Sequence, residues 1–224
     1  MEEYYKLRKD LSISLLGHKL FRIECIKELK NVEIGDLGGY IEKEENLTGD
    51  AWVSGNAKVY GNARVFGNAK VSGDAEVYGD AEVSGDAEVF GNAKVSGDAE
   101  VYGDAWVSGN AKVYGNAKVS GNARVSGDAW VYGNAKVFGN AEVYGNAEVY
   151  GDKIKDRSDV CNITGQVYNI TITPNHIKIG CQYHSKTAWF KFRDSEIEKM
   201  DGQQALDFWK VWKPILKSIC AKDK

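Results

Sequence analysis

A six-residue repeat constrains the fold of this chain more than any other feature. From Gly49 to Tyr150 the unit Gly–Asn/Asp–Ala–x–Val–x recurs, and every sixth residue from Val53 to Val149 is valine without exception. A fixed six-residue period is typical of a parallel β-solenoid. Leu47 and Ile41 continue the same register towards the N-terminus. We therefore expect a stack of coils in place of a conventional globular core.

The composition of the unit predicts the shape of each coil. In Ala-x-Val the side chains alternate, so that Ala and Val point inward and the residue between them points outward. Gly-Asn and Gly-Asp suit the corners because these residue types tolerate positive φ. Three units would close a triangular coil, and the array would make about six coils. No coil has a core of its own, so stability must come from stacking.

The repeat and its flanks also resemble a known group of proteins. The unit resembles the hexapeptide of left-handed parallel β-helix proteins, and Asp36–Glu42 and His176–Cys181 resemble phage- and prophage-encoded proteins often described as transferases or polymer-forming proteins. The resemblance implies a mainly β, single-stranded, left-handed parallel β-helix. It also implies an oligomer, with a homotrimer favoured.

Three regions follow from the pattern. Residues 1–40 contain the alternating stretch Lys19–Ile26, which predicts a strand in an N-terminal β cap. Residues 41–152 form the hexapeptide-repeat solenoid. Residues 153–224 form an α+β unit that either caps the solenoid or docks a partner.

Within the C-terminal unit, the dipeptide Pro174-Asn175 lies between two alternating stretches and predicts a hairpin. Ser195 begins a capping-box pattern, so we expect a short helix there that ends near Gly202. Apolar residues at helical spacing follow, and Pro214 is expected to kink or restart that helix.

Composition excludes several classes of function. The chain has 29 Lys and Arg against 32 Asp and Glu, a net charge of −3, which argues against a nucleic-acid partner. The four cysteines are spread without a CxxC motif and indicate reduced thiols. No apolar run has the length of a membrane span and no signal-peptide pattern is present. We therefore expect no membrane partner and a cytoplasmic location, in a bacterial host if the phage resemblance holds.

Catalytic and metal-binding residues are scarce. Acyltransferases built on this repeat use a histidine as general base, yet the only histidines are His18, His176 and His184, all outside the array. The array also has no inserted loop. Cys181 with two of these histidines lacks a fourth ligand at zinc-like spacing. We therefore predict no catalytic residue, no metal and no cofactor, and a transferase that uses His176 or His184 stays open as the alternative.

The outer surface holds the candidate binding residues. Positions separated by 18 residues should lie one above another, and one face then collects a row of tyrosines. Aromatic rings are enriched at protein interfaces. The predicted interface residues are Tyr60, Tyr78, Tyr114, Tyr132, Tyr150, Trp106 and Trp130. The alternative is a tyrosine ladder that stabilises its own stack.

These observations favour a non-enzymatic interaction scaffold. The resemblance suggests that it is related to phage proteins, forms a homotrimer and binds a host protein. The alternatives are sequestration of a small anionic ligand in clefts between subunits, or acyl transfer of the hexapeptide type.

Overall fold

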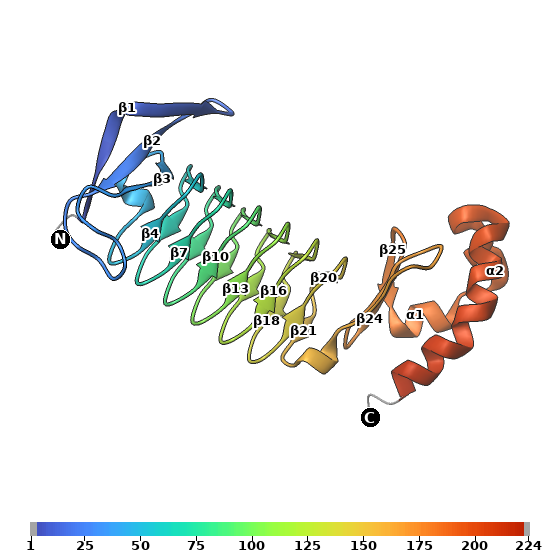
Figure 1. The fold of residues 1–224 in the computed structure, drawn as a ribbon. Coiled ribbons are helices and arrows are strands. Elements are labelled where there is room, and N and C mark those ends of the chain that lie inside the picture. Colours follow the sequence, from blue (N-terminus) through green and yellow to red (C-terminus); the bar gives the residue numbers. More distant parts are fainter. Residues whose placement is uncertain (1–3, 222–224) are drawn as a thin grey trace.

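The computed structural model describes residues 4–221 and contains the expected parallel β-solenoid of about six turns (Figure 1). An antiparallel hairpin lies at one end of the array, and a four-stranded sheet with two helices lies at the other. The predicted fold class is confirmed. The first three residues of the expected N-terminal cap and the last three of the C-terminal unit lie outside the described residues.

Three parallel sheets form the walls of the solenoid. The tyrosine wall continues the N-terminal hairpin and contains β3 (Leu37–Ile41), β5 (Lys58–Val59), β8 (Glu76–Val77), β11 (Lys94–Val95), β14 (Lys112–Val113), β17 (Trp130–Tyr132) and β20 (Glu148–Tyr150). The second wall contains β4 (Trp52–Val53), β7 (Lys70–Val71), β10 (Glu88–Val89), β13 (Trp106–Val107), β16 (Arg124–Val125) and β19 (Glu142–Val143). The third wall contains β6 (Arg64–Val65), β9 (Glu82–Val83), β12 (Glu100–Val101), β15 (Lys118–Val119), β18 (Lys136–Val137) and β21 (Lys153–Ile154).

Neighbouring strands in each wall are one coil apart in sequence. Val95 pairs with Val113, and the Lys94 N–H donates to the Ala111 carbonyl at 2.9 Å. Every repeat alanine and valine from Val53 to Val149 is completely buried. The core is therefore a continuous column of small side chains, and each coil supplies the backbone partners of the next.

The corner glycines are required for two separate reasons. Gly97 has φ +68, a conformation that costs L residues with a side chain roughly 1–2 kcal/mol. A Cβ at Gly97 would also lie 3.0 Å from the backbone nitrogen of Gly115 in the next coil. The adjacent polar residue links the coils, as where the Asn110 amide donates to Asp128 at 2.9 Å.

The array ends with a shortened unit. Gly151-Asp152 makes a corner as before, but the alanine is missing, and Lys153 and Ile154 follow at once. Ile154 nevertheless pairs with Val137 and is completely buried. The third wall thus continues two residues beyond position 152.

The N-terminal end is covered by a hairpin of β1 (Tyr5–Leu15) and β2 (His18–Cys25). β2 pairs antiparallel with β3, and its Leu20, Ile23 and Cys25 are completely buried. A short 3-10 helix, η1 (Glu44–Asn46), leads into the first coil. The expected strand over Lys19–Ile26 is thus present as β2.

The C-terminal unit contains β22 (Cys161–Ile163), β23 (Ile170–Ile172), β24 (His176–Ile179), β25 (Gln182–Ser185), α1 (Lys186–Lys191) and α2 (Asp194–Ala221), preceded by the 3-10 helix η2 (Arg157–Asp159). The hairpin predicted at Pro174-Asn175 joins β23 to β24. None of the helices in residues 4–221 combines the length and the apolarity that crossing a membrane requires.

The helix break lies at the predicted glycine and not at the proline. Within α2 only Asp201 and Gly202 leave helical geometry, Gly202 with φ +65. The expectation of a restart at Pro214 is wrong, because the helical backbone continues through it. Pro214 and Lys210 are both exposed, so water can bond the Lys210 carbonyl that loses its helix partner.

A leucine should distinguish the tight core from the outer surface. Ala99→Leu places three extra carbons inside a wall and should lower the unfolding free energy by about 1–3 kcal/mol. The matched control Lys136→Leu adds the same side chain at an exposed position and should change it by less than about 0.5 kcal/mol. Denaturant titration followed by far-UV circular dichroism measures both. Equal losses in the two variants would contradict a tightly packed core.

Candidate interaction surface

The predicted tyrosine row forms stacked pairs along the tyrosine wall. Tyr60 and Tyr78 stack with ring centroids 5.1 Å apart and planes 6° from parallel. Tyr114 and Tyr132 stack at 5.1 Å and 7°. Ser96 separates the two pairs. The spacing follows from the register, because equivalent residues of successive coils lie about 4.8 Å apart.

The row continues into both terminal units. At the N-terminal end the His18 ring lies 5.2 Å from Tyr60. At the C-terminal end the contacts run from Tyr132 to Tyr150 at 5.1 Å and from Tyr150 to Tyr183 at 5.4 Å. These aromatic contacts connect the array to the units at its two ends.

Burial within the chain differs along the row. Tyr60 is only 4% exposed, whereas Tyr150 is 46% exposed. Burial raises the pKa of Tyr60 and of Tyr132 to about 12, and the charges of Glu76 and Glu148 add to this effect. Most of the ring surface in the row therefore faces other parts of the same chain, and Tyr150 offers the largest fraction to a partner.

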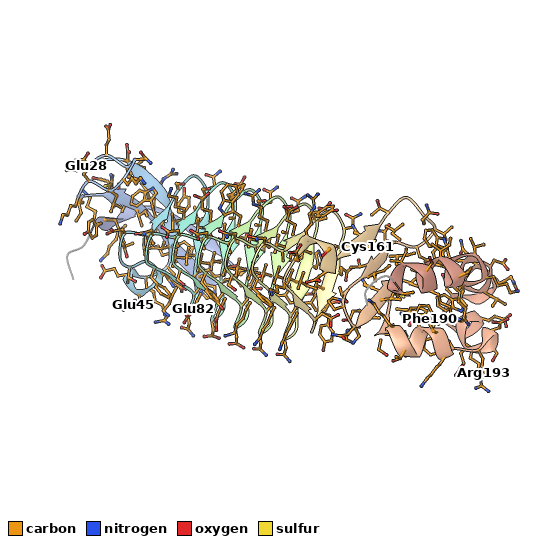
Figure 2. The ribbon with its side chains drawn as sticks, turned by 90° about the horizontal axis from the view of Figure 1, so that it is seen from below. Glu28, Glu45, Glu82, Cys161, Phe190 and Arg193 are labelled. Atoms are coloured by element: carbon orange, nitrogen blue, oxygen red, sulfur yellow. The ribbon has the colours of Figure 1, made fainter. Side chains whose placement is uncertain are left out.

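The two predicted tryptophans lie on different walls and each faces a cation. Trp106 on the second wall is 39% exposed, with the Arg124 guanidinium 4.8 Å from its ring. Trp130 on the tyrosine wall is 36% exposed, with the Lys112 ammonium at 4.4 Å. The seven predicted residues thus form one row plus a separate site on the neighbouring wall. Figure 2 shows the side chains along the array standing out from the coils, as Glu82 does.

Sequence reasoning missed the cations and two further aromatic side chains. Trp106 pairs with Arg124 and Trp130 with Lys112 across neighbouring coils. The signal was available, because each cation is one coil of 18 residues away from its tryptophan. Tyr102 on the third wall and Tyr144 on the second are also exposed, and both follow a repeat valine.

A buried polar cluster joins the last corner of the array to the C-terminal sheet. The Asp152 carboxylate is 2% exposed and accepts hydrogen bonds from the Thr173 hydroxyl, from the Asn175 amide at 2.9 Å and from His176 Nδ1 at 2.9 Å. Burial raises the pKa of Asp152, but these three donors outweigh burial and hold it below the usual 3.8. The Asp152 carboxylate is therefore ionised, and the three donors stabilise its charge.

The C-terminal sheet presents different residues to its two sides. Thr171 accepts a hydrogen bond from the Glu148 N–H, and Lys178 forms an ion pair with Glu148. The alternating Ile177 and Ile179 pack instead into a cluster with Trp189 and Trp209 of the helices. One side thus contacts the last coil and the other carries the core of the unit.

The remaining histidine candidates are separated by this sheet. His176 lies on the solenoid side against Tyr183, with rings 4.8 Å apart. His184 lies on the helix side, 5.2 Å from Trp189, and burial lowers its pKa. Within residues 4–221 no three His, Cys, Asp or Glu side chains are grouped to hold a metal ion.

Comparison with known proteins agrees with the repeat architecture. The family described as the YdcK beta solenoid repeat matches residues 57–73 and 117–133. Both segments lie inside the array, and each is about one coil long. A search among curated proteins finds no match. The similarity supports a repeat β-solenoid and covers only these two segments.

Removal of the Asp152 charge should loosen the C-terminal unit. Asp152→Asn leaves the donors of Thr173 and His176 without their charged acceptor and should destabilise the contact by about 1–3 kcal/mol. Hydrogen exchange of the β23 and β24 amides measures this loss.

The same residue predicts a pH dependence. The pKa of Asp152 is lower in the folded protein than in the unfolded chain. As the pH falls below about 4, the unfolded chain therefore binds more protons than the folded protein, and the free energy of unfolding decreases. In Asp152→Asn this part of the acid sensitivity should be absent. An unchanged acid profile in the variant would contradict the assignment.

Tyrosines inside and outside the row should respond differently to substitution. Tyr132→Ser removes a stacked, half-buried ring and should cost about 1–2 kcal/mol of unfolding free energy. Tyr102→Ser removes an exposed ring of the third wall and should cost less than about 0.5 kcal/mol. Chemical denaturation measures the unfolding free energy of the two variants. If Tyr102→Ser is the more damaging change, the row does not stabilise the stack.

Proposed function

We propose that this protein is a non-enzymatic interaction scaffold, whose walls bind further protein chains. The observation that carries the proposal is the pair of exposed tryptophans, each beside a cation, on the outside of a stack whose alanines and valines are fully buried. Each ring contacts a cation of a neighbouring coil, and Trp130 also lies 6.2 Å from Tyr114, yet more than a third of each residue stays exposed. Contact with a partner would bury this remaining surface.

Aromatic and arginine side chains are the residue types that dominate protein interfaces. Tryptophan, tyrosine and arginine are enriched among the residues whose loss costs most binding energy. Trp106, Arg124 and Phe90 lie together, with Phe90 6.1 Å from Trp106 in an edge-on contact. Such a cluster combines apolar area with a fixed charge.

The rigidity of the stack favours binding. Each outward residue is attached to a strand whose N–H groups bond the next coil, as the Trp106 N–H bonds Ala123 at 2.9 Å. Side chains held on fixed strands lose little conformational entropy when a partner binds. The array can therefore present its aromatic side chains in a preorganised arrangement.

The positions of the tryptophans are compatible with a closed homotrimer. Trp130 lies on the tyrosine wall and Trp106 on the second wall. If the Trp130 wall of one copy contacts the Trp106 wall of the next, the contact is heterologous, and three copies close a ring. The resemblance of the flanks to phage proteins favours a host protein as a further partner.

The double substitution Trp106→Ser with Trp130→Ser tests the proposal. We expect the wild-type chain to sediment as a trimer over about 1–100 µM. The double variant should dissociate at least tenfold more readily, because truncated aromatic anchors commonly cost more than about 1 kcal/mol each. Its far-UV circular dichroism spectrum should match that of the wild type, since the buried alanines and valines of the core are unchanged.

A control on the third wall separates a local from a general effect. Lys136→Ser with Lys153→Ser changes two exposed side chains away from the tryptophans and should leave the trimer intact. A wild-type monomer over the whole range would contradict self-association, and equal dissociation of both double variants would contradict the assignment of the interface to the tryptophans.

A further inference from the structure

The third wall carries an outward row in which large and small residues alternate. The residues that follow its buried valines are, in chain order, Phe66, Ser84, Tyr102, Ser120 and Phe138. Neighbouring aromatic residues of this row are therefore two coils apart, about 9.6 Å at the usual spacing of strands. Tyr102 is 39% exposed, so neither terminal unit covers the middle of the row. The trimer contact proposed for the tryptophans uses the other two walls and leaves this wall free.

Each serine of the row stands where the tyrosine wall has a ring. On the tyrosine wall, rings one coil apart stack with centroids 5.1 Å apart, as Tyr114 and Tyr132 do. A ring placed beside Ser120 would lie about 4.8 Å along the array from Tyr102 and from Phe138, which is a normal separation for aromatic contact. The third wall itself carries rings at the matching spacing of two coils. A second copy of this wall can therefore interdigitate its rings with those of the first.

The charges of the same wall select one arrangement of the two copies. The residues that precede its buried aliphatic residues are, in chain order, Arg64, Glu82, Glu100, Lys118, Lys136 and Lys153. Two antiparallel copies related by a twofold axis between β12 and β15 bring Glu100 opposite Lys118 and Glu82 opposite Lys136. Facing opposite charges favour this register, and facing like charges disfavour others. Only the outermost pair at each end of the contact is like-charged.

The same register also separates the rings. Tyr102 of one copy then lies level with Ser120 of the other, and Phe138 lies level with Ser84. A twofold axis at β12 would instead place Tyr102 against Tyr102. An axis between β9 and β12 would place the two glutamates of the wall opposite each other. One register thus satisfies both the sizes and the charges of the outward residues.

We infer that two copies of this protein pair through their third walls, antiparallel and with the twofold axis between β12 and β15. In such an isologous contact both copies use the same surface, so the contact closes after two copies. The pairing joins walls that the tryptophan contact does not use. It therefore goes beyond the proposed function and does not depend on it.

The pairing is expected to be weak in the wild-type protein. Each strand of the wall has only two residues, so the contact is smaller than the roughly 800 Å² per partner of a standard interface. Glu82 and Glu100 also pair within their own chain, with Arg64 and with Lys118. The contact between copies must compete with these ion pairs. We therefore expect the wild-type pair to form only above about 100 µM.

Charge reversal gives two variants that should pair with each other and not with themselves. Glu82→Lys with Glu100→Lys makes the wall basic, and Lys118→Glu with Lys136→Glu makes its middle acidic. Each variant alone brings like charges together, whereas in the equimolar mixture every reversed residue faces an opposite charge. By sedimentation equilibrium at about 0.1–1 mM the mixture should associate at least tenfold more tightly than either variant alone. The other two walls are identical in all three samples, so trimer formation does not affect the comparison.

A ring at position 120 separates interdigitation from general attraction between a basic and an acidic chain. Ser120→Tyr, introduced into both charge variants, occupies the place of Tyr102 of the second copy and should weaken association of the mixture at least tenfold. Ser218→Tyr adds the same ring at an exposed position of α2 and should leave the association unchanged. A mixture that associates no more tightly than the separate variants would overturn the pairing. Association that survives Ser120→Tyr would overturn the interdigitated register.

Discussion

Stacking of one coil on the next is the interaction on which the rest of this structure depends. Successive strands within the repeat array are offset by 18 residues, so a buried valine such as Val95 lies beside Val113 of the next coil. The same register carries the backbone hydrogen bonds and the corner amide contacts between coils. Because no coil encloses a core alone, the valine contacts, the backbone hydrogen bonds and the corner amide contacts all require the stack.

That register also arranges the outer surface. It places Tyr114 against Tyr132 and Trp106 beside Arg124, since each pair differs by one coil. The tyrosine row is used largely within the chain and reaches both terminal units, whereas the tryptophans stay exposed. The same register thus stabilises the tyrosine wall through contacts within the chain. It also leaves aromatic surface available to a partner on the tyrosine wall and on the second wall.

The array was predicted well from the sequence because every unit uses the same inward alanine and valine and the same glycine corner. It could not predict features that depend on a single contact. The Asp152 cluster forms because a corner aspartate meets Thr173 and His176 of a distant sheet, and no local pattern marks that meeting. The helix break followed from Gly202, while the restart expected at Pro214 does not occur, because the exposed backbone there tolerates the proline. For the tryptophans, the cation partners at a distance of one coil were readable and were missed.

Hydrogen exchange along the full chain tests the central claim that the coils stabilise one another. If stacking supplies the stability, amides that bond between middle coils, such as those of Lys94 and Glu100, should exchange slowest, and protection should decline towards both ends of the array. If the middle coils instead exchange faster than the first and last coils, neighbours on both sides add no protection, and stacking is not the source of the stability.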